Sequence, residues 1–566
     1  MIKNKQFNLY GGIMKKKIFS IFLAAMLLLT ACGKNENKVA KTNNGNSVKS
    51  EEQTDYKSPN GNTMVLTLFQ NPKTLDIQKT NADYFIPLQI YDRLVDVKVN
   101  DDGTNEIVPS LAEKWDISED GKTYTFYLRK GVKFHNGEEF KADDVLFTIE
   151  KMMDPKEAAV NTYQFEKIEG ALDKLNGKAD SVKGVKVIDD YTVSITLDQP
   201  FPPFLASLTG APASIFNRKA VEEGKDKFGF DPEYTVGTGY MKFKDWAQDK
   251  EINLVRNDDY FGEKANIDGV RYLMNIDSST SKMMLENGEL DFRKISSAEL
   301  DSYKENPIFK DNIVDSQRAG MDYISFNQKD PNMAKVEVRK AVSMAIDRDL
   351  INKTFYNGEG TIVNGVLPPG IPGYEVEQEK IEYNPEKAKE LLKEAGLDKG
   401  LTLISLQNST YEEDQAKNEM IQSMLKNIGI DLQIKTVDAT SYYDILTKGE
   451  GFSMSIEPVT ADVPDPDDFY QAFTVEAGES NGLKVQDKAL SDEINKARFI
   501  INQEERIKAL TSLDKKIVGE QALYLPLVSD LNHFAKSPRL DNFKLSWQGW
   551  VCGSTHFVKI DPKYNK

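Results

Sequence analysis

The alternation of strand and helix patterns between residues 384 and 434 constrains the fold more than any other feature of this sequence. Asn384-Pro385 supplies a cap and a proline at the first helical position, and Gly396 stops that helix. A strand pattern (Leu401–Leu406), an apolar helical stripe (Ala416–Ile428) and a second strand pattern (Ile430–Ile434) then follow. Strand, helix and strand in this order predict a parallel pair with a right-handed crossover, so we expect an α/β architecture.

The N-terminal half adds antiparallel hairpins. Asp120-Gly121 supplies a turn between Trp115 and Leu128, where apolar residues alternate. Asp189-Asp190 separates a second pair of short strands of the same kind, Val185–Val187 and Val193–Leu197. A mostly apolar stretch from Lys141 to Met152 predicts a helix between the two hairpins.

The N-terminus has the pattern of an export signal. Lys15 to Lys17 precede a 12-residue apolar run, Ile18 to Leu29, whereas a membrane-spanning helix needs about 20 residues. The run ends in Leu29-Thr30-Ala31-Cys32-Gly33, which resembles the lipobox of bacterial lipoproteins. The resemblance implies cleavage before Cys32 and a diacylglyceryl group on its sulfur. Residues 1–31 are then a signal peptide, with Met14 as our hypothesis for the start of translation, and residues 32–60 are a polar, lipidated, disordered tether.

Charge and cysteine content exclude some classes of protein. The net charge is −17, and residues 1–31 hold five lysines and no acid, so the processed chain carries −22. Such an acidic chain is not suited to nucleic acid, which needs basic patches. Only Cys32 and Cys552 exist, so the mature chain has no internal disulfide, and we expect Cys552 to be buried.

Many short blocks in the folded part resemble one family, the solute-binding proteins of ABC importers that carry dipeptides, oligopeptides or nickel. The blocks come in family order and cover essentially everything after Asn60. They include Pro109–Trp115, Leu128–Gly137, Ala142–Val145, Val236–Tyr240, Asn287–Asp291, Val338–Ala341, Ala345–Arg348, Leu367–Gly370, Asn384–Ala388 and Pro464–Phe469.

The resemblance implies an α/β, two-lobed fold like that of periplasmic binding proteins (type II, cluster C), with an extra domain inserted in the first lobe. We expect a discontinuous first lobe (61–92, 207–317 and 528–566), the extra domain (93–206) and a second lobe (318–527). The ligand would lie between lobes that close on it by a hinge motion.

The resemblance also suggests where a ligand binds. In peptide-binding relatives, an aspartate shortly before a Pro-Asp-Pro-like segment pairs with the peptide ammonium, and Asp462 holds this position. Its neighbours Val459, Thr460 and Ala461 are included in the predicted site. The alternative is a turn before Pro464. Pro458-Val459 replaces the usual Gly-Trp, which leaves the length and nature of the ligand open.

Other candidates have a plain structural alternative. Asn81, Ala82 and Tyr84 lie in a segment resembling the first-lobe part of the cleft, and an ordinary loop is the other interpretation. Trp547 and Trp550 either line an aromatic wall or pack in the core. Asp465, Asp467 and Asp468 suggest a metal cluster, but Pro-Asp-Pro-Asp is more typical of turns and caps. No basic residue can be assigned to a ligand carboxylate.

The sequence does not indicate an enzyme. It contains three histidines, in unrelated contexts, and no phosphate loop, zinc spacing or nucleophile elbow. We expect a monomeric receptor without cofactor, on the outer face of the bacterial cell membrane. Its partners would be a short peptide, the membrane through the lipid on Cys32, and ABC permease subunits with their ATPases. A receptor of the same family for nickel, haem or another solute, and a peptide-sensing surface lipoprotein, remain alternatives.

Overall fold

The computed structural model describes residues 56–68, 71–80, 84–100, 105–375, 378–397, 400–478, 481–548 and 555–566. Residues Thr54–Lys566 form one compact unit. None of the helices within these ranges combines the length and the apolar character needed to cross a membrane. The predicted signal peptide, Cys32, Asn81, Ala82, Trp550 and Cys552 lie outside the described residues.

Two sheets from both ends of the chain form the first lobe. One has the order β1-β10-β9-β8, with β1 parallel to β10 and the other neighbours antiparallel; the second, β11-β20-β12, is antiparallel. Their strands are β1 (Thr63–Thr67), β8 (Met241–Ala247), β9 (Glu251–Arg256), β10 (Gly269–Leu273), β11 (Phe292–Ile295), β12 (Ile313–Gln317) and β20 (Leu531–Lys536). The helices nearby in sequence are α1 (Pro87–Ile90), α5 (Arg218–Gly224), α6 (Ser278–Glu286) and α7 (Ser297–Glu305). Two short pairs accompany these sheets: β21 (Leu540–Asp541) with β22 (Lys559–Ile560) in the C-terminal segment, and β2 (Val95–Val99) with β3 (Asn105–Pro109), whose Val95 and Ile107 pack in the core described next.

A separate antiparallel sheet, β4-β5-β7-β6, contains both predicted hairpins. Its strands are β4 (Ala112–Ile117), β5 (Thr123–Leu128), β6 (Val185–Asp189) and β7 (Thr192–Thr196). It has a hydrophobic core of its own, to which Phe126, Val193 and Ile195 contribute. Helices α2 (Ala142–Met152), α3 (Ala171–Leu175) and α4 (Phe204–Ser207) supply further residues of that core.

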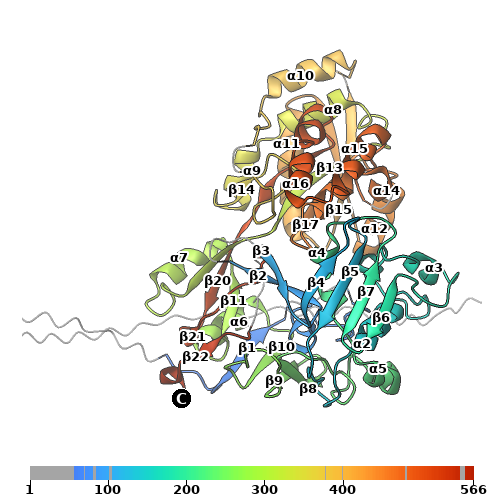
Figure 1. The fold of residues 1–566 in the computed structure, drawn as a ribbon. Coiled ribbons are helices and arrows are strands. Elements are labelled where there is room, and N and C mark those ends of the chain that lie inside the picture. Colours follow the sequence, from blue (N-terminus) through green and yellow to red (C-terminus); the bar gives the residue numbers. More distant parts are fainter. Residues whose placement is uncertain are drawn as a thin grey trace, which may run out of the picture. The chain divides into compact units, whose positions relative to one another are not determined.

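The second lobe is built on a five-stranded sheet of order β16-β15-β17-β13-β18. Its strands are β13 (Gly320–Phe326), β15 (Leu401–Asn408), β16 (Ile430–Val437), β17 (Met454–Thr460) and β18 (Tyr524–Pro526). Strands β15 and β16 are parallel, with Leu401 opposite Ile430, and β17 pairs parallel to β15 and antiparallel to β13. The predicted strand–helix–strand unit is therefore confirmed, with α11 (Glu412–Lys426) as its crossover helix. Figure 1 shows this sheet and its helices together, apart from the sheets of the first lobe.

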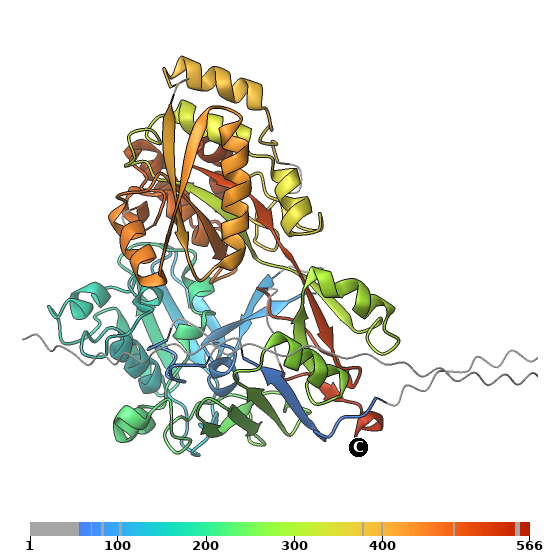
Figure 2. The same cartoon turned by 180° about the vertical axis from the view of Figure 1, so that it is seen from behind.

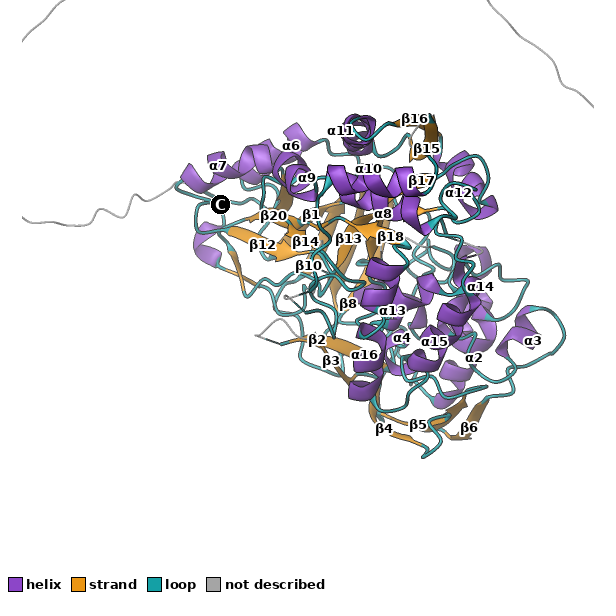
Figure 3. Ribbon diagram, turned by 90° about the horizontal axis from the view of Figure 1, so that it is seen from above, coloured by secondary structure: helices purple, strands orange, loops and turns teal. Residues whose placement is uncertain are grey.

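Helices cover both faces of the five-stranded sheet. One face packs on α8 (Val336–Ala345), α9 (Arg348–Phe355), α10 (Pro385–Glu394) and α11, and Figure 2 shows α11 running along the strands. The opposite face packs on α13 (Asp467–Tyr470), α15 (Lys488–Arg498) and α16 (Gln503–Thr511). Figure 3 shows these two groups on opposite sides of the strands, with α14 (Val475–Gly478) in the second group. Helix α12 (Ala439–Lys448) contributes to a smaller cluster at one end of the sheet.

The chain passes between the lobes at two adjacent segments. Gln317, the last residue of β12, donates through Nε2 to Ser529 Oγ at 2.7 Å, and Arg318 Nε pairs with Asp530 Oδ1 at 2.6 Å. Ser529 belongs to β19 (Val528–Ser529), which pairs with β14 (Thr361–Ile362) of the second lobe. The two crossings are therefore held to each other by side-chain bonds.

A histidine adds a further link beside the crossings. His533 Nδ1 lies 2.7 Å from Asp315 Oδ1 on the neighbouring strand β12, and His533 Nε2 lies 3.0 Å from Glu359 Oε2 in the second lobe. The His533 ring thus connects strand β12 of the first lobe to the second lobe.

The structure corrects the predicted end of the tether. Tyr56 is 4 % exposed, and its hydroxyl donates to Leu285 O at 3.1 Å. Ser58 bridges to the C-terminal segment at Asn565. Residues 56–60 are therefore part of the fold, whereas we predicted disorder up to Asn60. This segment is mostly polar, which led to the prediction of disorder, but the side chain of Tyr56 fills a hydrophobic core between α6 and the C-terminus.

Candidate functional site

Asp462 lies just beyond the end of β17, on a loop whose backbone is held firmly. Ala461 N donates to Ala319 O at 2.9 Å, which continues the ladder between β17 and β13. Asp462 N then donates to Asp468 Oδ2 at 2.6 Å, so the side chain of Asp468, six residues further along the same loop, holds the backbone at Asp462. Because these bonds use the backbone N–H groups of Ala461 and Asp462, the Asp462 side chain takes no part in holding the loop and is accessible to solvent.

Two buried ion pairs fasten the rest of this loop. Arg506 binds both oxygens of Asp465, at 2.8 and 2.6 Å, and Arg498 binds both oxygens of Asp467, at 2.5 and 3.0 Å. Bidentate pairs of this kind fix geometry as well as charge. Asp465 and Asp467 therefore have structural partners on α16 and α15, in keeping with the structural alternative for these residues.

Three segments distant in sequence meet at Asp462. Tyr163, in a short 3₁₀ turn (Thr162–Gln164), donates its hydroxyl to Asp462 Oδ2 at 3.3 Å. Tyr84 lies next to this turn, because Asn161 Nδ2 donates to Tyr84 Oη at 2.9 Å and to Thr80 O at 2.8 Å. We call Tyr84, Tyr163, Asp462 and Asp468 the Asp462 cluster.

The electrostatics of the cluster favour a cation. Solvent reaches the Asp462 side chain, but the protein atoms packed around the carboxylate desolvate it and raise its pKa, while the hydrogen bond from Tyr163 opposes the shift. Desolvation together with the Asp462 charge raises the pKa of Asp468. The pKa of Tyr84 rises to about 12, mainly through burial, with the Asp462 charge adding to the shift. Among the described residues, no lysine, arginine or histidine forms an ion pair with either aspartate. An incoming ammonium group would relieve this unbalanced negative charge.

The other predicted residues differ in their placement. Val459 and Thr460 form the end of β17, with Val459 packed against a hydrophobic core of the second lobe. Ala461 is 1 % exposed in that core, and its carbonyl accepts from Gln548 Nε2 at 3.0 Å, so its side chain does not face the Asp462 cluster. Trp547 is half-buried against the same core. Sequence reasoning missed Tyr163 and the partnership of Asp468 with the loop backbone, for which no motif gave a signal.

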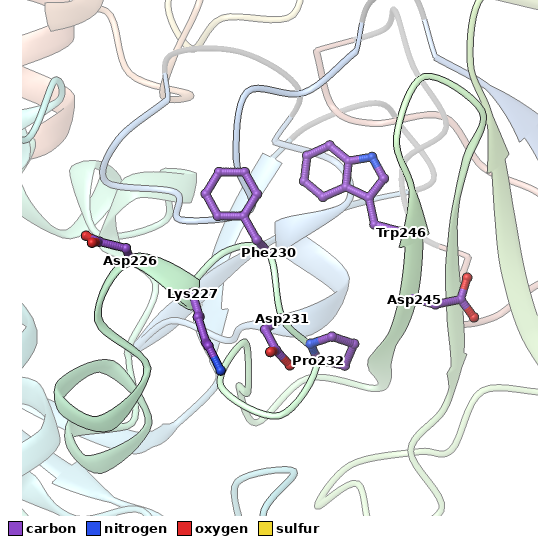
Figure 4. A pocket seen from close by; sticks show the side chains of 7 residues that line it. All are labelled: Asp226, Lys227, Phe230, Asp231, Pro232, Asp245 and Trp246. Atoms are coloured by element: carbon purple, nitrogen blue, oxygen red, sulfur yellow. The ribbon is translucent and has the colours of Figure 1, made fainter.

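A surface hollow elsewhere on the first lobe is lined by two aromatic rings as well as charged residues. It has a volume of about 540 Å³ and is lined by residues between Asp226 and Trp246, where Phe230 and Trp246 stack with ring centroids 5.7 Å apart. Figure 4 shows these two rings side by side, with the Asp226 and Asp245 carboxylates on either side, away from them. No residue of the Asp462 cluster lines it.

Comparison with known proteins defines the class. The sequence pattern described as "Bacterial extracellular solute-binding proteins, family 5 Middle" matches residues 106–481. The chain is 32% identical over 459 residues to the dipeptide-binding protein of Escherichia coli, covering 77% of this chain and 83% of that protein. It is 30% identical over 579 residues to heme-binding protein A of Haemophilus influenzae, covering 97% and 100%.

A solved structure agrees with these relatives. The periplasmic binding protein DppA of Helicobacter pylori, in complex with the peptide STSA, has a TM-score of 0.72 and 29% identity, covering 89% of this chain and 99% of that one. This protein belongs to family 5 of the bacterial extracellular solute-binding proteins. It is thus an extracytoplasmic binding protein of an ABC importer and not an enzyme, and the predicted two-lobed α/β fold is confirmed.

Proposed function

We propose that this protein captures short peptides between its lobes and delivers them to an ABC permease. The family and the peptide-binding relatives support this reading. The observation that carries it is the Asp462 cluster, in which two carboxylates without a cationic partner face two tyrosines. A free peptide carries an ammonium group that must find such a partner once water is excluded.

In this proposal Asp462 accepts from the ligand ammonium. Tyr163 and Tyr84 close the site from the other side, so the peptide N-terminus connects the lobes. The rest of the ligand extends beside Val459 and Thr460, where main-chain hydrogen bonding gives affinity that is indifferent to side-chain identity. Ala461, being buried, is not included among the contacts.

We further propose that the lobes move about the paired crossings. We propose the predicted domain limits with one change, the start of the first lobe at residue 56: first lobe 56–92, 207–317 and 528–566, extra domain 93–206, second lobe 318–527. The bonds from Gln317 to Ser529 and from Arg318 to Asp530 support rotation about this point, because they join the two crossing segments to each other.

The test is replacement of Asp462 by asparagine, which keeps the size and the acceptor for Tyr163 but removes the charge. We expect the affinity for a free-amine peptide such as tetra-alanine to fall at least about tenfold, the factor to which ~1.4 kcal/mol corresponds. The N-acetylated peptide is expected to bind the unaltered protein weakly. Isothermal titration calorimetry measures both.

A matched control is Asp492→Asn, an exposed aspartate on α15, which is expected to leave binding unchanged. Equal affinity of Asp462→Asn and the unaltered protein for tetra-alanine would remove Asp462 from the site.

Haem is the second candidate ligand, because heme-binding protein A matches nearly the whole chain. The acidic Asp462 cluster argues against it, since haem propionates are themselves anionic and would be repelled. Titration with haem, followed by absorbance, discriminates: a saturable spectral change that tetra-alanine does not compete would favour haem over peptide.

We also propose that lipid on Cys32 anchors the protein to the outer face of the cell membrane, where it acts as a monomer with the permease and its ATPases. Two acyl chains give a stable anchor at about 0.8 kcal/mol per buried methylene. Cys32→Ser is expected to release the protein into the medium or leave the signal uncut, as seen by fractionation and immunoblotting. A membrane-bound, lipid-labelled Cys32→Ser variant would contradict the anchor.

A further inference from the structure

A second polar hollow lies on the α11 side of the five-stranded sheet. Its volume is about 510 Å³, and its walls include Asp322 from β13, Asp414 and Lys417 from α11, and Pro458 from β17. Arg318 and Asp530 of the two crossings close one side. The hollow is thus built from both lobe crossings and the second lobe.

The cations of this hollow are already neutralised. Lys417 Nζ donates to Asp322 Oδ2 at 2.7 Å, and Arg318 Nη2 donates to Asp322 Oδ1 at 2.8 Å. The hydroxyl of Tyr356 also donates to Asp322. Asp322 therefore serves as the common counter-ion of Lys417 and Arg318. Burial by itself would raise the pKa of Asp322, but these partners outweigh burial and lower the pKa to about 2.

Asp414 has only a distant cationic partner. Its residue is 9 % exposed, yet Lys417 Nζ lies 3.8 Å from Asp414 Oδ1, beyond hydrogen-bond distance, because Lys417 is directed at Asp322. Burial raises the pKa of Asp414 to about 6, and Lys417 lowers it only in part. The hollow is lined by four carboxylates and two cations: Asp322, Glu413, Asp414 and Asp530 against Arg318 and Lys417. This excess of negative charge favours an additional positive charge in the hollow and disfavours an anion.

The position relates this hollow to the Asp462 cluster. Pro458 lines it and stands four residues before Asp462 along the end of β17. At ~3.3 Å per extended residue this is a separation of about 13 Å. An extended peptide with its ammonium at Asp462 would reach the hollow with its third, fourth or fifth residue.

We propose that this hollow, the Asp414 pocket, receives the cationic side chain of a lysine or arginine of the bound peptide, so that the protein prefers basic peptides. The inference rests on the proposed peptide function. Tyr411, 41 % exposed at the rim, offers a ring along which the apolar stem of such a side chain can pack. A metal ion is disfavoured, because the described residues contain no group of three or more His, Cys, Asp or Glu placed to hold one.

The experiment compares lysine with norleucine, which has the same stem without the charge. Penta-alanine peptides with either residue at positions two to five are titrated into the full protein by calorimetry. We expect at least about tenfold preference for lysine at one position. Asp414→Asn is expected to reduce this preference to less than about twofold while leaving the norleucine peptide unaffected. Asp431→Asn, on the exposed side of β16, is the matched control and should retain the preference.

The preference should also depend on pH. Protonation of Asp414 removes the negative charge, so the lysine-to-norleucine ratio is expected to fall between about pH 7.5 and about pH 5. The ratio cancels the titration of Asp462, which both peptides share. The other charged or titratable groups around Asp414 are Arg318, Asp322, Tyr356, Tyr411, Glu413, Lys417 and Asp530.

The outcomes separate the two hypotheses. If unsubstituted penta-alanine binds but no position favours lysine over norleucine, the Asp414 pocket assignment is wrong and peptide capture stands. If Asp414→Asn retains the full preference, the cation binds elsewhere and the assignment is also wrong. If no peptide binds, peptide capture itself fails, and the assignment fails with it.

Discussion

The aspartates between residues 462 and 468 have the same chemistry and quite different roles. Asp465 and Asp467 are buried against arginines, Asp468 accepts backbone hydrogen bonds, and Asp462 is exposed beside Tyr163. The arginines lie on α15 and α16, so the loop that carries Asp462 is held by residues 31 and 41 positions further along the chain. A rigid loop of this kind keeps a binding carboxylate in place before the ligand arrives.

A test at this scale is Asp465→Asn, which leaves the Arg506 charge buried without its counter-ion. Arg506 is 1 % exposed, so the expected loss of stability is about 3–5 kcal/mol. Thermal or urea unfolding measures it. Asp465→Leu combined with Arg506→Met is expected to recover much of the loss, because no charge then remains buried. A single variant as stable as the unaltered protein would show that the pair does not hold the loop.

Single residues were predictable where their roles are local or shared with relatives. Asp462 was found through its position before a Pro-Asp-Pro segment. Its partner Tyr163 was not found, because 299 residues separate the two. Asp414 was not singled out either, because an acidic residue near the start of a helix is ordinary and only burial beside Lys417 distinguishes it.

At the scale of elements, helices and strands were predicted best from the sequence where capping residues and apolar periodicity agree. Asn384 accepts from Lys387 N at 3.0 Å at the start of α10, and Gly396 adopts φ +70° just after its end, as the motif predicted. The hairpins around Asp120-Gly121 and Asp189-Asp190 were likewise correct. These features depend on contacts within a few residues, so the local sequence contains the information needed.

Strand order was not predictable in the same way. Strand β17 lies between β15 and β13, and β13 begins at Gly320, 140 residues before its partner Thr460. A Cβ at Gly320 would stand 2.2 Å from Val459 O, so this close approach depends on the absence of a side chain. Nothing near Gly320 in the sequence indicates the neighbour. Pairing of this kind is decided by which hydrophobic faces can be buried together.

At the scale of the whole molecule, buried carboxyl groups set the response to pH. Burial raises the pKa of Asp92, Asp144 and Asp514 to about 6. A group whose pKa is raised on folding adds stability below its unfolded pKa of about 4, and this is lost as the pH rises through about 6. Burial lowers the pKa of His135 to about 4, so this residue reduces the stability of the fold as the pH falls below ~6.5, opposite to the effect of the aspartates. The more numerous aspartates are expected to dominate.

We therefore expect the melting temperature to be higher at about pH 5 than at about pH 8, at constant ionic strength. Self-repulsion from a net charge of −17 acts in the same direction, because it grows with pH. Differential scanning calorimetry measures the trend, and Asp514→Asn should reduce the slope. A melting temperature that rises from the acid to the alkaline condition would contradict this account.

The sequence by itself determined the class of protein, the α/β character and the local elements, because family motifs, caps, turns and apolar periodicity depend on neighbouring residues. Only the tertiary structure decided which strands are neighbours, that Tyr56 belongs to the fold, and that Tyr84 and Tyr163 meet Asp462. It also decided that Asp414 is buried with Lys417 no closer than 3.8 Å, while Asp322 has three hydrogen-bonding partners. Burial and charge balance are properties of the packed chain, and they arise only when distant segments exclude water from one another.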